Sequence, residues 1–195
     1  MPADRRNLWR MNMKLQEPIR TPRLVIRSYT NADREFLLST WGDRENGRYM
    51  VDPARENQDE RYLSLIDGME DEPDGYYLIA ELREDGTRVG TCCAFPENGN
   101  YDIGYCIVKD RWKEGLGTEM IGALLGWIRE QGGTSASGEI ADLNAASIAL
   151  VRKLGFVQDR ESWYKKWGEE TYFDAHFYRI DLAPEGKEQA AGGKD

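Results

Sequence analysis

Apolar residues alternate with polar ones along several short segments of the chain, which is the pattern of half-buried strands. These segments predict a first strand around Val25, a hairpin of 76–82 with 89–95, and a strand over 102–108. Turn residues separate the later strands, in the runs Asp74-Gly75, Glu84-Asp85-Gly86 and Asn98-Gly99-Asn100. The middle of the chain is therefore expected to form neighbouring antiparallel strands.

Other segments repeat their apolar residues at helical spacing. Thr30-Asn31 is expected to cap one helix, and a second helix spans about 57–67. Two more helices begin after 115 and 144, with a short strand over 136–140 between them and two strands at the end. The order β-α-α-β-β-β-α-β-α-β-β predicts an α/β (α+β) fold, a mixed and mainly antiparallel sheet of about seven strands flanked by about four helices.

A glycine-rich run joins the strand over 102–108 to the third helix, and its residues are Glu114-Gly115-Leu116-Gly117-Thr118-Glu119. Such a turn offers free backbone N–H groups at a helix start, where the helix dipole adds partial positive charge. The run lacks the third glycine of a dinucleotide fingerprint and the Gly-Lys-Ser/Thr of a P-loop. It indicates either a phosphate-binding turn or only a tight turn.

A second motif runs from Asn144 to Phe156. Asn144 is a good helix cap, and Gly155 stands where a left-handed residue ends a helix. Taken alone, this motif needs no function beyond a capped core helix and its exit.

Together the two motifs resemble the GNAT N-acetyltransferases, and within them the Rim-type branch, named for enzymes that acetylate the N-termini of ribosomal proteins. The matching patterns are W-x-x-G-x-G-T-E, starting at Trp112, and N-x-x-S-x(5)-K-x-G-F, starting at Asn144. The opening run from Ile19 to Arg27 with Asp33, and the closing segment 168–182 with Asp174, also resemble the family. The resemblance covers about 19–183. It leaves 1–18 as a mobile or docking arm and 184–195 as a frayed tail.

The resemblance implies that acetyl-CoA binds where the strands 102–108 and 136–141 splay apart. The backbone near Ile107 and Val108 would hold the pantetheine arm and the acetyl carbonyl, and Asn144 would hydrogen-bond the pantetheine. Backbone N–H groups would hold the pyrophosphate, from Lys113, Glu114, Gly115, Leu116, Gly117 and Thr118. The candidate cations for the 3′-phosphate are Lys113, Arg152 and Lys153, each of which could equally be a solvated surface residue. Trp112 is expected to pack rather than react.

The implied chemistry is direct attack of a neutral amine on the thioester, which needs a base and stabilisation of the oxyanion. Glu139 is the favoured base, with Asp142, Glu161 and Glu169 as alternatives. Many family members carry a tyrosine seven residues after the motif asparagine, where this chain has Val151. Ser147 is therefore the candidate that stabilises or protonates the leaving thiolate, although a plain first-turn serine remains the alternative.

Charge argues for a cationic acceptor. The chain has a net charge of −9, and 19–183 alone carry −10, which speaks against nucleic-acid binding. Eight acidic residues and one basic residue, Arg61, lie between Glu56 and Asp74, beside the expected acceptor mouth. They would attract a basic N-terminus, a polyamine or an aminoglycoside, or they form a solvated face. The segment 163–167 either covers the acceptor or ends a hairpin.

The three cysteines, Cys92, Cys93 and Cys106, fall in expected strands, which favours a reducing cytoplasm over a disulfide framework. One histidine, His176, and buried cysteines give no metal site, and a structural role is expected for this histidine. No segment has the length or composition of a signal peptide or membrane helix.

Several hypotheses remain open at this point. The acceptor of an acetyltransferase would be a protein N-terminus or a small cationic amine. A non-catalytic acyl-CoA-binding or regulatory module of the same fold is the alternative from another class, and an unrelated nucleotide-binding protein is a third. Leu8, Trp9 and Met11 could dock the arm on a partner subunit, which leaves a homodimer possible.

Overall fold

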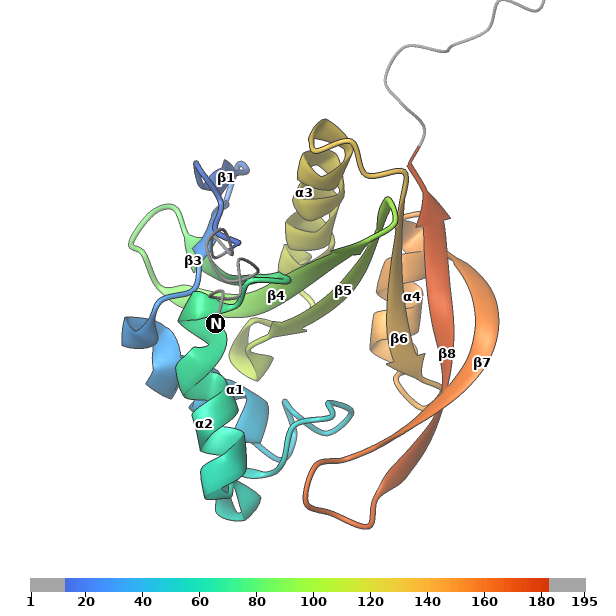
Figure 1. Ribbon diagram of the computed structural model, residues 1–195. Helices are drawn as coiled ribbons and strands as arrows, with labels where there is room; N and C mark the ends of the chain where they lie inside the picture. Colours follow the sequence, from blue (N-terminus) through green and yellow to red (C-terminus); the bar gives the residue numbers. More distant parts are fainter. Residues whose placement is uncertain (1–12, 183–195) are drawn as a thin grey trace, which may run out of the picture.

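The computed structural model describes residues 13–182, which form one mixed sheet flanked by helices (Figure 1). Eight strands and four α-helices occur in this part of the chain. The strands follow the order β1-β2-β3-β4-β5-β6-β8-β7 across the sheet. The strands are β1 (Ile19–Arg20), β2 (Leu24–Ser28), β3 (Tyr76–Leu82), β4 (Arg88–Glu97), β5 (Asn100–Ile107), β6 (Ser135–Ala141), β7 (Val157–Lys165) and β8 (Tyr172–Asp181). The helices are α1 (Arg34–Gly42), α2 (Glu60–Gly68), α3 (Leu116–Glu130) and α4 (Ala145–Lys153).

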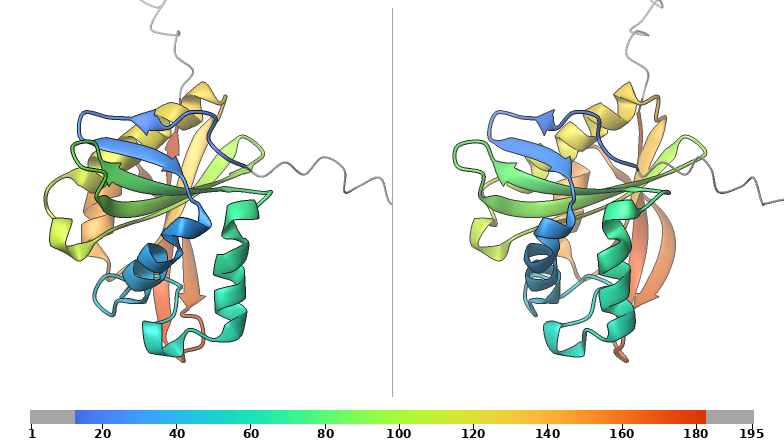
Figure 2. Two further views of the ribbon diagram at one scale, coloured as in Figure 1. Left: turned by 90° about the vertical axis from the view of Figure 1, so that its left-hand side faces the viewer. Right: turned by 60° about the vertical axis from the view of Figure 1, so that its left-hand side comes forward.

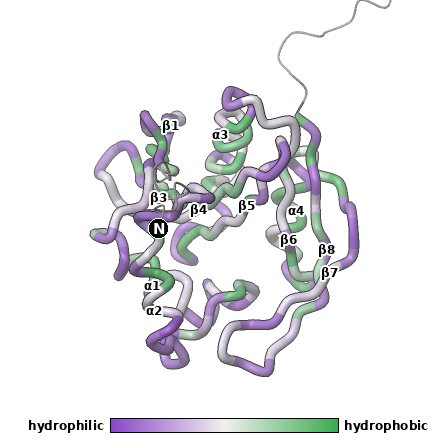
Figure 3. The backbone as a smooth tube through the Cα atoms, viewed as in Figure 1, coloured by the Kyte–Doolittle hydropathy of each residue, from purple (hydrophilic) through white to green (hydrophobic). Residues whose placement is uncertain are grey.

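The two faces of the sheet carry different helices, as the views of Figure 2 show. One face packs against α3 and α4 around the larger core, to which α3 contributes six buried residues. Figure 3 marks the hydrophobic positions along α3 in green. The other face packs against α1 and α2, with Ile79 and Cys106 of the sheet in that smaller core. Because side chains alternate along a strand, neighbouring residues of β5 belong to different faces. Tyr101, Ile103 and Tyr105 point to the α3/α4 face, and Cys106 points to the α1/α2 face.

The sheet opens between β5 and β6. These two parallel strands pair only over Asn100–Asp102 with Ser135–Ser137, and the other strand pairs are antiparallel. Beyond Asp102 the strands diverge, which Figure 1 shows as a widening gap between their ribbons. The sheet thus holds a fork whose closed end lies at Asp102.

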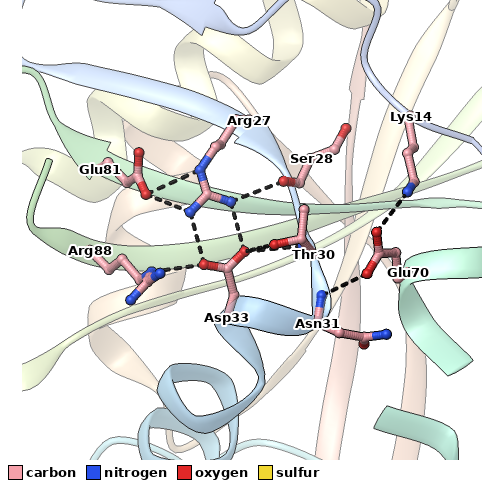
Figure 4. A network of polar contacts seen from close by, with 9 residues as sticks. All are labelled: Lys14, Arg27, Ser28, Thr30, Asn31, Asp33, Glu70, Glu81 and Arg88. Carbon is pink, nitrogen blue, oxygen red and sulfur yellow. Dashed lines mark hydrogen bonds and ion pairs between the residues drawn. The ribbon is translucent and has the colours of Figure 1, made fainter. Parts of the chain in front are cut away.

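A buried ion-pair network fixes the start of α1 to the sheet (Figure 4). Asp33 is fully buried and accepts two hydrogen bonds from Arg27, at 2.7 and 2.8 Å, while Arg88 lies 2.7 Å away. Thr30 donates to the same carboxylate through its N–H and its hydroxyl group, each at 3.0 Å. Burial alone would raise the pKa of Asp33, but these donors outweigh it and lower the pKa to about 2.

The expected fold is confirmed, with some corrections at the ends of elements. The two-residue strand β1 was not predicted, because two residues are too short to show alternation. The second helix begins at Glu60 rather than at 57, because Arg55–Asn57 form a 3₁₀ turn and Asp59 caps the helix by accepting from the Tyr62 N–H at 2.7 Å. None of the helices in 13–182 is long and apolar enough to cross a membrane.

The arm is described only from Met13 onwards. The Met13 N–H donates to the Glu72 carbonyl at 3.1 Å, and the Leu15 N–H donates to the Ser28 hydroxyl at 2.8 Å. Residues 1–12, with the apolar side chains expected to dock on a partner, and 183–195 lie outside the described residues. The arm, the tail and the homodimer therefore stay predictions.

Candidate active site

A cleft of about 1040 Å³ occupies the fork between β5 and β6. It is lined from four directions, by both strands, by the starts of α3 and α4, by the loop that follows α1, and by Tyr164 of β7. Asp102 and Gly138 line its narrow end, and Trp112 and Lys113 line it beside α3. The cleft passes from one face of the sheet to the other, so it has an α3/α4 half and an α1/α2 half.

The glycine-rich turn lies at the α3 end of this cleft. Gly115 is the residue before α3 and has a φ of 79°, and Lys113 also has a positive φ, of 65°. A left-handed backbone favours glycine, which is why Gly115 stands at the sharpest point of the turn. The helix start faces the cleft through Leu116, Gly117 and Thr118. Such a turn suits an anion, because a helix start offers unpaired N–H groups.

Arg23 supports the turn from behind. Its guanidinium donates to the Glu114 carbonyl at 2.8 Å and to the Glu119 carboxylate at 2.6 Å. Glu119 also accepts from the Thr21 hydroxyl at 2.6 Å. Burial alone would raise the pKa of Glu119, but these donors lower it. The carboxylate of Glu119, in the first turn of α3, is therefore held by the loop between β1 and β2.

Beyond Asp102, the edge of β5 that faces β6 is not paired with β6, and its backbone groups at Tyr105 and Ile107 form a ledge along the cleft. The Val108 N–H donates to the Val89 carbonyl of the neighbouring segment at 3.0 Å, so Val108 points to β4. The Gly99 carbonyl accepts from the Thr134 N–H at 2.8 Å, on the β6 side. Because backbone direction alternates in an antiparallel ladder, the odd residues Tyr105 and Ile107 turn their N–H and C=O groups toward the fork. There β6 has already diverged from β5. The Ile107 carbonyl accepts a hydrogen bond from the Trp112 indole N–H at 2.7 Å, and the backbone groups of Tyr105 remain for a bound chain.

Tyr105 and the first turn of α4 meet on the α3/α4 side of the cleft. The Tyr105 hydroxyl donates to the Ser147 carbonyl at 3.4 Å, and burial raises the pKa of Tyr105 to about 12. Asn144 caps α4 by accepting from the Ser147 N–H at 3.2 Å. Val151, where many relatives were expected to place a tyrosine, is buried in the core. The phenol of Tyr105 therefore remains protonated at neutral pH and lies beside Ser147.

Two carboxylates, Asp102 and Glu139, line the cleft near the narrow end of the fork. Asp102 stands on the last paired position of β5, and Glu139 stands two residues beyond the last paired position of β6. The Ser162 hydroxyl donates to Glu139. Part of Asp102 is accessible, yet its partial burial in the cleft and the charge of Glu139 raise the pKa of its carboxyl group, while Arg160 opposes the shift. A carboxylate with a raised pKa is a better proton acceptor than an ordinary one.

The end of the β7–β8 hairpin closes the α1/α2 half of the cleft against the loop that follows α1. The Tyr164 hydroxyl donates to the Tyr49 carbonyl at 2.6 Å, and the Trp167 N–H donates to the Val51 carbonyl at 2.7 Å. The buried Lys166 donates to the carbonyls of Gly47 and Met50, at 2.8 and 3.0 Å. The segment 163–167 therefore ends the hairpin, and it contributes Tyr164 to the lining of the cleft. That it covers the acceptor stays a prediction.

Most of the residues expected at the site from the sequence line the cleft. They are Ile107, Lys113, Gly115, Leu116, Gly117, Thr118, Glu139, Asn144 and Ser147. Val108, Glu114 and Lys153 do not line it. Val108 has its N–H engaged with Val89, and the exposed Lys153 stands in the last turn of α4.

The alternative bases lie elsewhere. Asp142 pairs with His176 at 2.7 Å, and Glu169 accepts from the Asn57 side chain at 3.2 Å. Glu161 stands on the edge strand β7 and does not line the cleft. Sequence reasoning missed Asp102 and Tyr105, although the alternation along 102–108 already placed them on opposite faces of one strand.

The acidic stretch between Glu56 and Asp74 contributes only Met69 to the described lining of the cleft. Several of its acids are engaged with basic residues elsewhere on the surface, in the pairs Glu56–Arg44, Asp67–Arg34 and Glu70–Lys14. The negative charge at the cleft comes instead from side chains of the sheet and of the loop after α1. The acidic side chains that could attract a cationic acceptor are therefore Glu45, Asp52, Asp102 and Glu139, which line the cleft.

Comparison with known proteins agrees with this geometry. A family model described as an acetyltransferase (GNAT) domain matches residues 23–157. The chain belongs to the GNAT acetyltransferases. It is 25% identical over 171 residues to YoaA of Bacillus subtilis (strain 168), an uncharacterised N-acetyltransferase, and the match covers 83% of this chain and 95% of the relative.

Solved structures share the fold. Spermidine N-acetyltransferase from Vibrio cholerae, in complex with CoA and spermine, superposes with a TM-score of 0.69 at 16% identity, over 83% of this chain and 96% of that one. Ribosomal-protein-alanine N-acetyltransferase from Brucella melitensis has a TM-score of 0.62 at 25% identity, over 80% of this chain and 99% of that one.

Proposed function

We propose that this protein is an acetyl-CoA-dependent N-acetyltransferase that transfers the acetyl group to a primary amine by direct attack. The main support for the proposal is that one cleft contains a glycine-rich helix start in one part and a pair of carboxylates in another part. The glycine-rich start of α3 suits a pyrophosphate, and the carboxylates Asp102 and Glu139 suit a cationic amine. From Ile107 back to Asp102 the strand covers roughly 16 Å, which gives room for an extended pantetheine arm.

The cofactor half of the cleft would hold acetyl-CoA mainly through backbone groups. The start of α3, from Lys113 to Thr118, would bind the pyrophosphate, and the cationic side chain of Lys113 lines the cleft there. The ledge of Tyr105 and Ile107 would pair with the pantetheine arm as a neighbouring strand would. Asn144 at the start of α4 would bind the same arm from the other side. This arrangement directs the thioester toward the narrow end of the fork.

The acceptor half would supply the base. An ammonium group attracted by Asp102 and Glu139 gives up one proton to this pair, and the neutral nitrogen attacks the acetyl carbon. A carbon–nitrogen bond forms and the carbon–sulfur bond breaks. The nitrogen, which is positively charged after the attack, loses its second proton to solvent, and the CoA thiolate takes a proton. Tyr105, beside Ser147, is placed to give that proton, and its phenol is protonated at neutral pH. Ser147 is the second candidate for this role.

The acceptor is either a protein N-terminus, as for the Rim-type branch, or a small cationic amine. Neighbouring structures with the same fold carry both kinds of name, ribosomal-protein-alanine and spermidine N-acetyltransferase. A non-catalytic acyl-CoA-binding module is the competing function. The carboxylate pair at the end of the cleft favours the enzyme, because a binding module has no use for a coupled proton acceptor there.

Thiol release from acetyl-CoA, measured with a panel of amines, tests the proposal. The panel contains peptides with basic and acidic N-termini, spermidine and an aminoglycoside. Turnover with one class identifies the enzyme and its acceptor class. Tight acetyl-CoA binding by calorimetry without turnover on any amine would favour the binding module.

Gly115→Ala is expected to weaken acetyl-CoA binding about tenfold. The substituted residue would sit in the left-handed region at a cost of about 1–2 kcal/mol, and the turn that presents the N–H groups would shift. Gly86→Ala is the matched control, because Gly86 has a similar φ of 73° but lies in the open β3–β4 turn. Calorimetry should show weaker binding for Gly115→Ala alone. Equal affinities in the two variants would contradict the assignment of the turn.

Tyr105→Phe is expected to lower kcat about tenfold or more while the KM for acetyl-CoA changes little, because it removes one hydroxyl group that acts late in the reaction. Ser147→Ala, measured in parallel, separates the two candidate donors. Steady-state thiol release gives both parameters. A kcat that is unchanged in Tyr105→Phe and lowered in Ser147→Ala would assign the role to the serine.

A further inference from the structure

The acceptor half of the cleft contains a third carboxylate, Asp52, in the loop between α1 and α2. Only 9% of this residue is exposed, and it lines the cleft. It accepts a hydrogen bond from the Tyr62 hydroxyl at 2.9 Å. No ion pair among residues 13–182 includes it. A buried carboxylate without a paired cation is costly, so its place at a cleft wall calls for an explanation.

The nearest cation does not complete the pair. Lys166 is close enough to favour the charged form of Asp52, but its ammonium group donates to the carbonyls of Gly47 and Met50. Burial nevertheless dominates, and the pKa of Asp52 is raised in spite of Tyr62 and Lys166. A cation arriving in the cleft would therefore find a carboxylate that gains from the contact.

The wall between Asp52 and the carboxylate pair is largely apolar. Tyr77, Cys93 and Gly104 are register partners on β3, β4 and β5, and each lines the cleft. At the usual spacing of strands, this row spans roughly 10 Å. Phe95 lies directly opposite Asp102 and packs edge-to-face on Tyr77, with ring centroids 5.4 Å apart. The wall thus suits a hydrocarbon chain.

The two ends of this wall belong to one cleft, because Asp52, Cys93 and Asp102 all line it. Burial raises the pKa of the Cys93 thiol to about 12, and the charges of Asp102 and Asp52 add to the shift. Gly104 lies beside Cys93 and has no side chain. A Cβ at this position would lie 3.0 Å from the Cys93 sulfur, so the glycine leaves more space in the cleft at this point.

We infer that Asp52 is a second cation-binding point, so that the preferred acceptor is a primary amine with a second positive charge at the far end of an apolar chain. This inference rests on the proposed function. One ammonium group reaches Asp102 and Glu139 and loses its proton, and the other stays charged at Asp52. A diaminoalkane and a peptide with lysine beside its N-terminus share this chemistry.

Thiol release with matched acceptors tests the inference. Diaminoalkanes of increasing length are compared with monoalkylamines of the same length, and lysine-containing peptides with norleucine analogues. The wild type is expected to prefer the doubly charged acceptor of the best length by about tenfold or more in kcat/KM. Preference within the first set, the second, or both identifies the source of the acceptor.

Asp52→Asn is expected to remove that preference by lowering kcat/KM for the doubly charged acceptor, with the monoamine changed about twofold at most. Tyr62→Phe keeps the carboxylate and should keep the preference. Met69→Lys places a cation in the lining of the same cleft without removing Asp52, and should abolish the preference where Met69→Gln does not. If Asp52→Asn fails to fold, the comparison of Met69→Lys with Met69→Gln still tests the inference.

An equal loss for both acceptors in Asp52→Asn, or a wild type without any preference, would overturn the inference while turnover still supported the acetyltransferase. A Met69→Lys variant that kept the preference would also overturn it. No thiol release from any amine would overturn both the inference and the proposed function.

Discussion

Replacing both fork carboxylates, in Asp102→Asn with Glu139→Gln, is expected to lower kcat/KM by about 10²–10⁴-fold, the usual contribution of general base catalysis. Each single variant should lose less, because the remaining carboxylate can still accept the proton. The acidic limb of the pH profile of kcat/KM carries further information. The base must be deprotonated, and the pKa of Asp102 is raised by burial and by Glu139, so activity should rise with pH above the ordinary range of a carboxyl group.

Glu139→Gln gives a signed test of that coupling. Removing the charge of Glu139 removes one cause of the raised pKa, so the acidic limb should move to lower pH. Glu161→Gln is the matched control, because Glu161 lies on β7 outside the cleft and should leave rate and profile unchanged. A double variant with wild-type activity would show that a water chain or another group takes the proton.

Asp33→Asn is expected to lower the free energy of unfolding by about 3–5 kcal/mol, because it leaves Arg27 and Arg88 facing a neutral group in a buried network. Chemical denaturation at neutral pH measures the loss. Asp110→Asn, on an exposed 3₁₀ turn, should change stability by less than about 0.5 kcal/mol.

The same carboxylate sets part of the acid stability of the wild type. The folded-state pKa of Asp33 is lowered from 3.8 to about 2, so its charge stabilises the fold at pH values above the unfolded pKa. That contribution, about 2–3 kcal/mol, is lost as the pH falls from about 5 toward 2. Asp33→Asn should lack this part of the pH dependence. Parallel stability curves for the two proteins would show that the network does not hold the charge.

Local sequence signals were sufficient to predict the elements that line the proposed cofactor half of the cleft. The Asn144 cap and the left-handed Gly155, with a φ of 95°, follow from side-chain and backbone chemistry within a few residues. The turn at Gly115 follows from the same kind of reasoning. Alternation along a strand also places the adjacent Cys92 and Cys93 on opposite sides of the sheet, and Cys92 lies in the larger core.

The acceptor half depends on contacts that no local pattern reports. Asp102 becomes important only because β6 leaves β5 at that residue and brings Glu139 opposite, 37 positions later in the sequence. Asp52 lies in a loop without periodicity, and Lys166, from a distant hairpin, holds that loop through the carbonyls of Gly47 and Met50. The acidic stretch between Glu56 and Asp74 gave a wrong indication because basic residues much earlier in the chain, Lys14 and Arg34, engage two of its acids.

The most direct test of the acetyltransferase is the mass of the acceptor itself after incubation with the protein and acetyl-CoA. Direct attack predicts that the acceptor amine gains one acetyl group, that free CoA appears in equal amount, and that the protein carries no acetyl group. An unchanged acceptor across the amine panel, with acetyl-CoA left intact, would contradict the account.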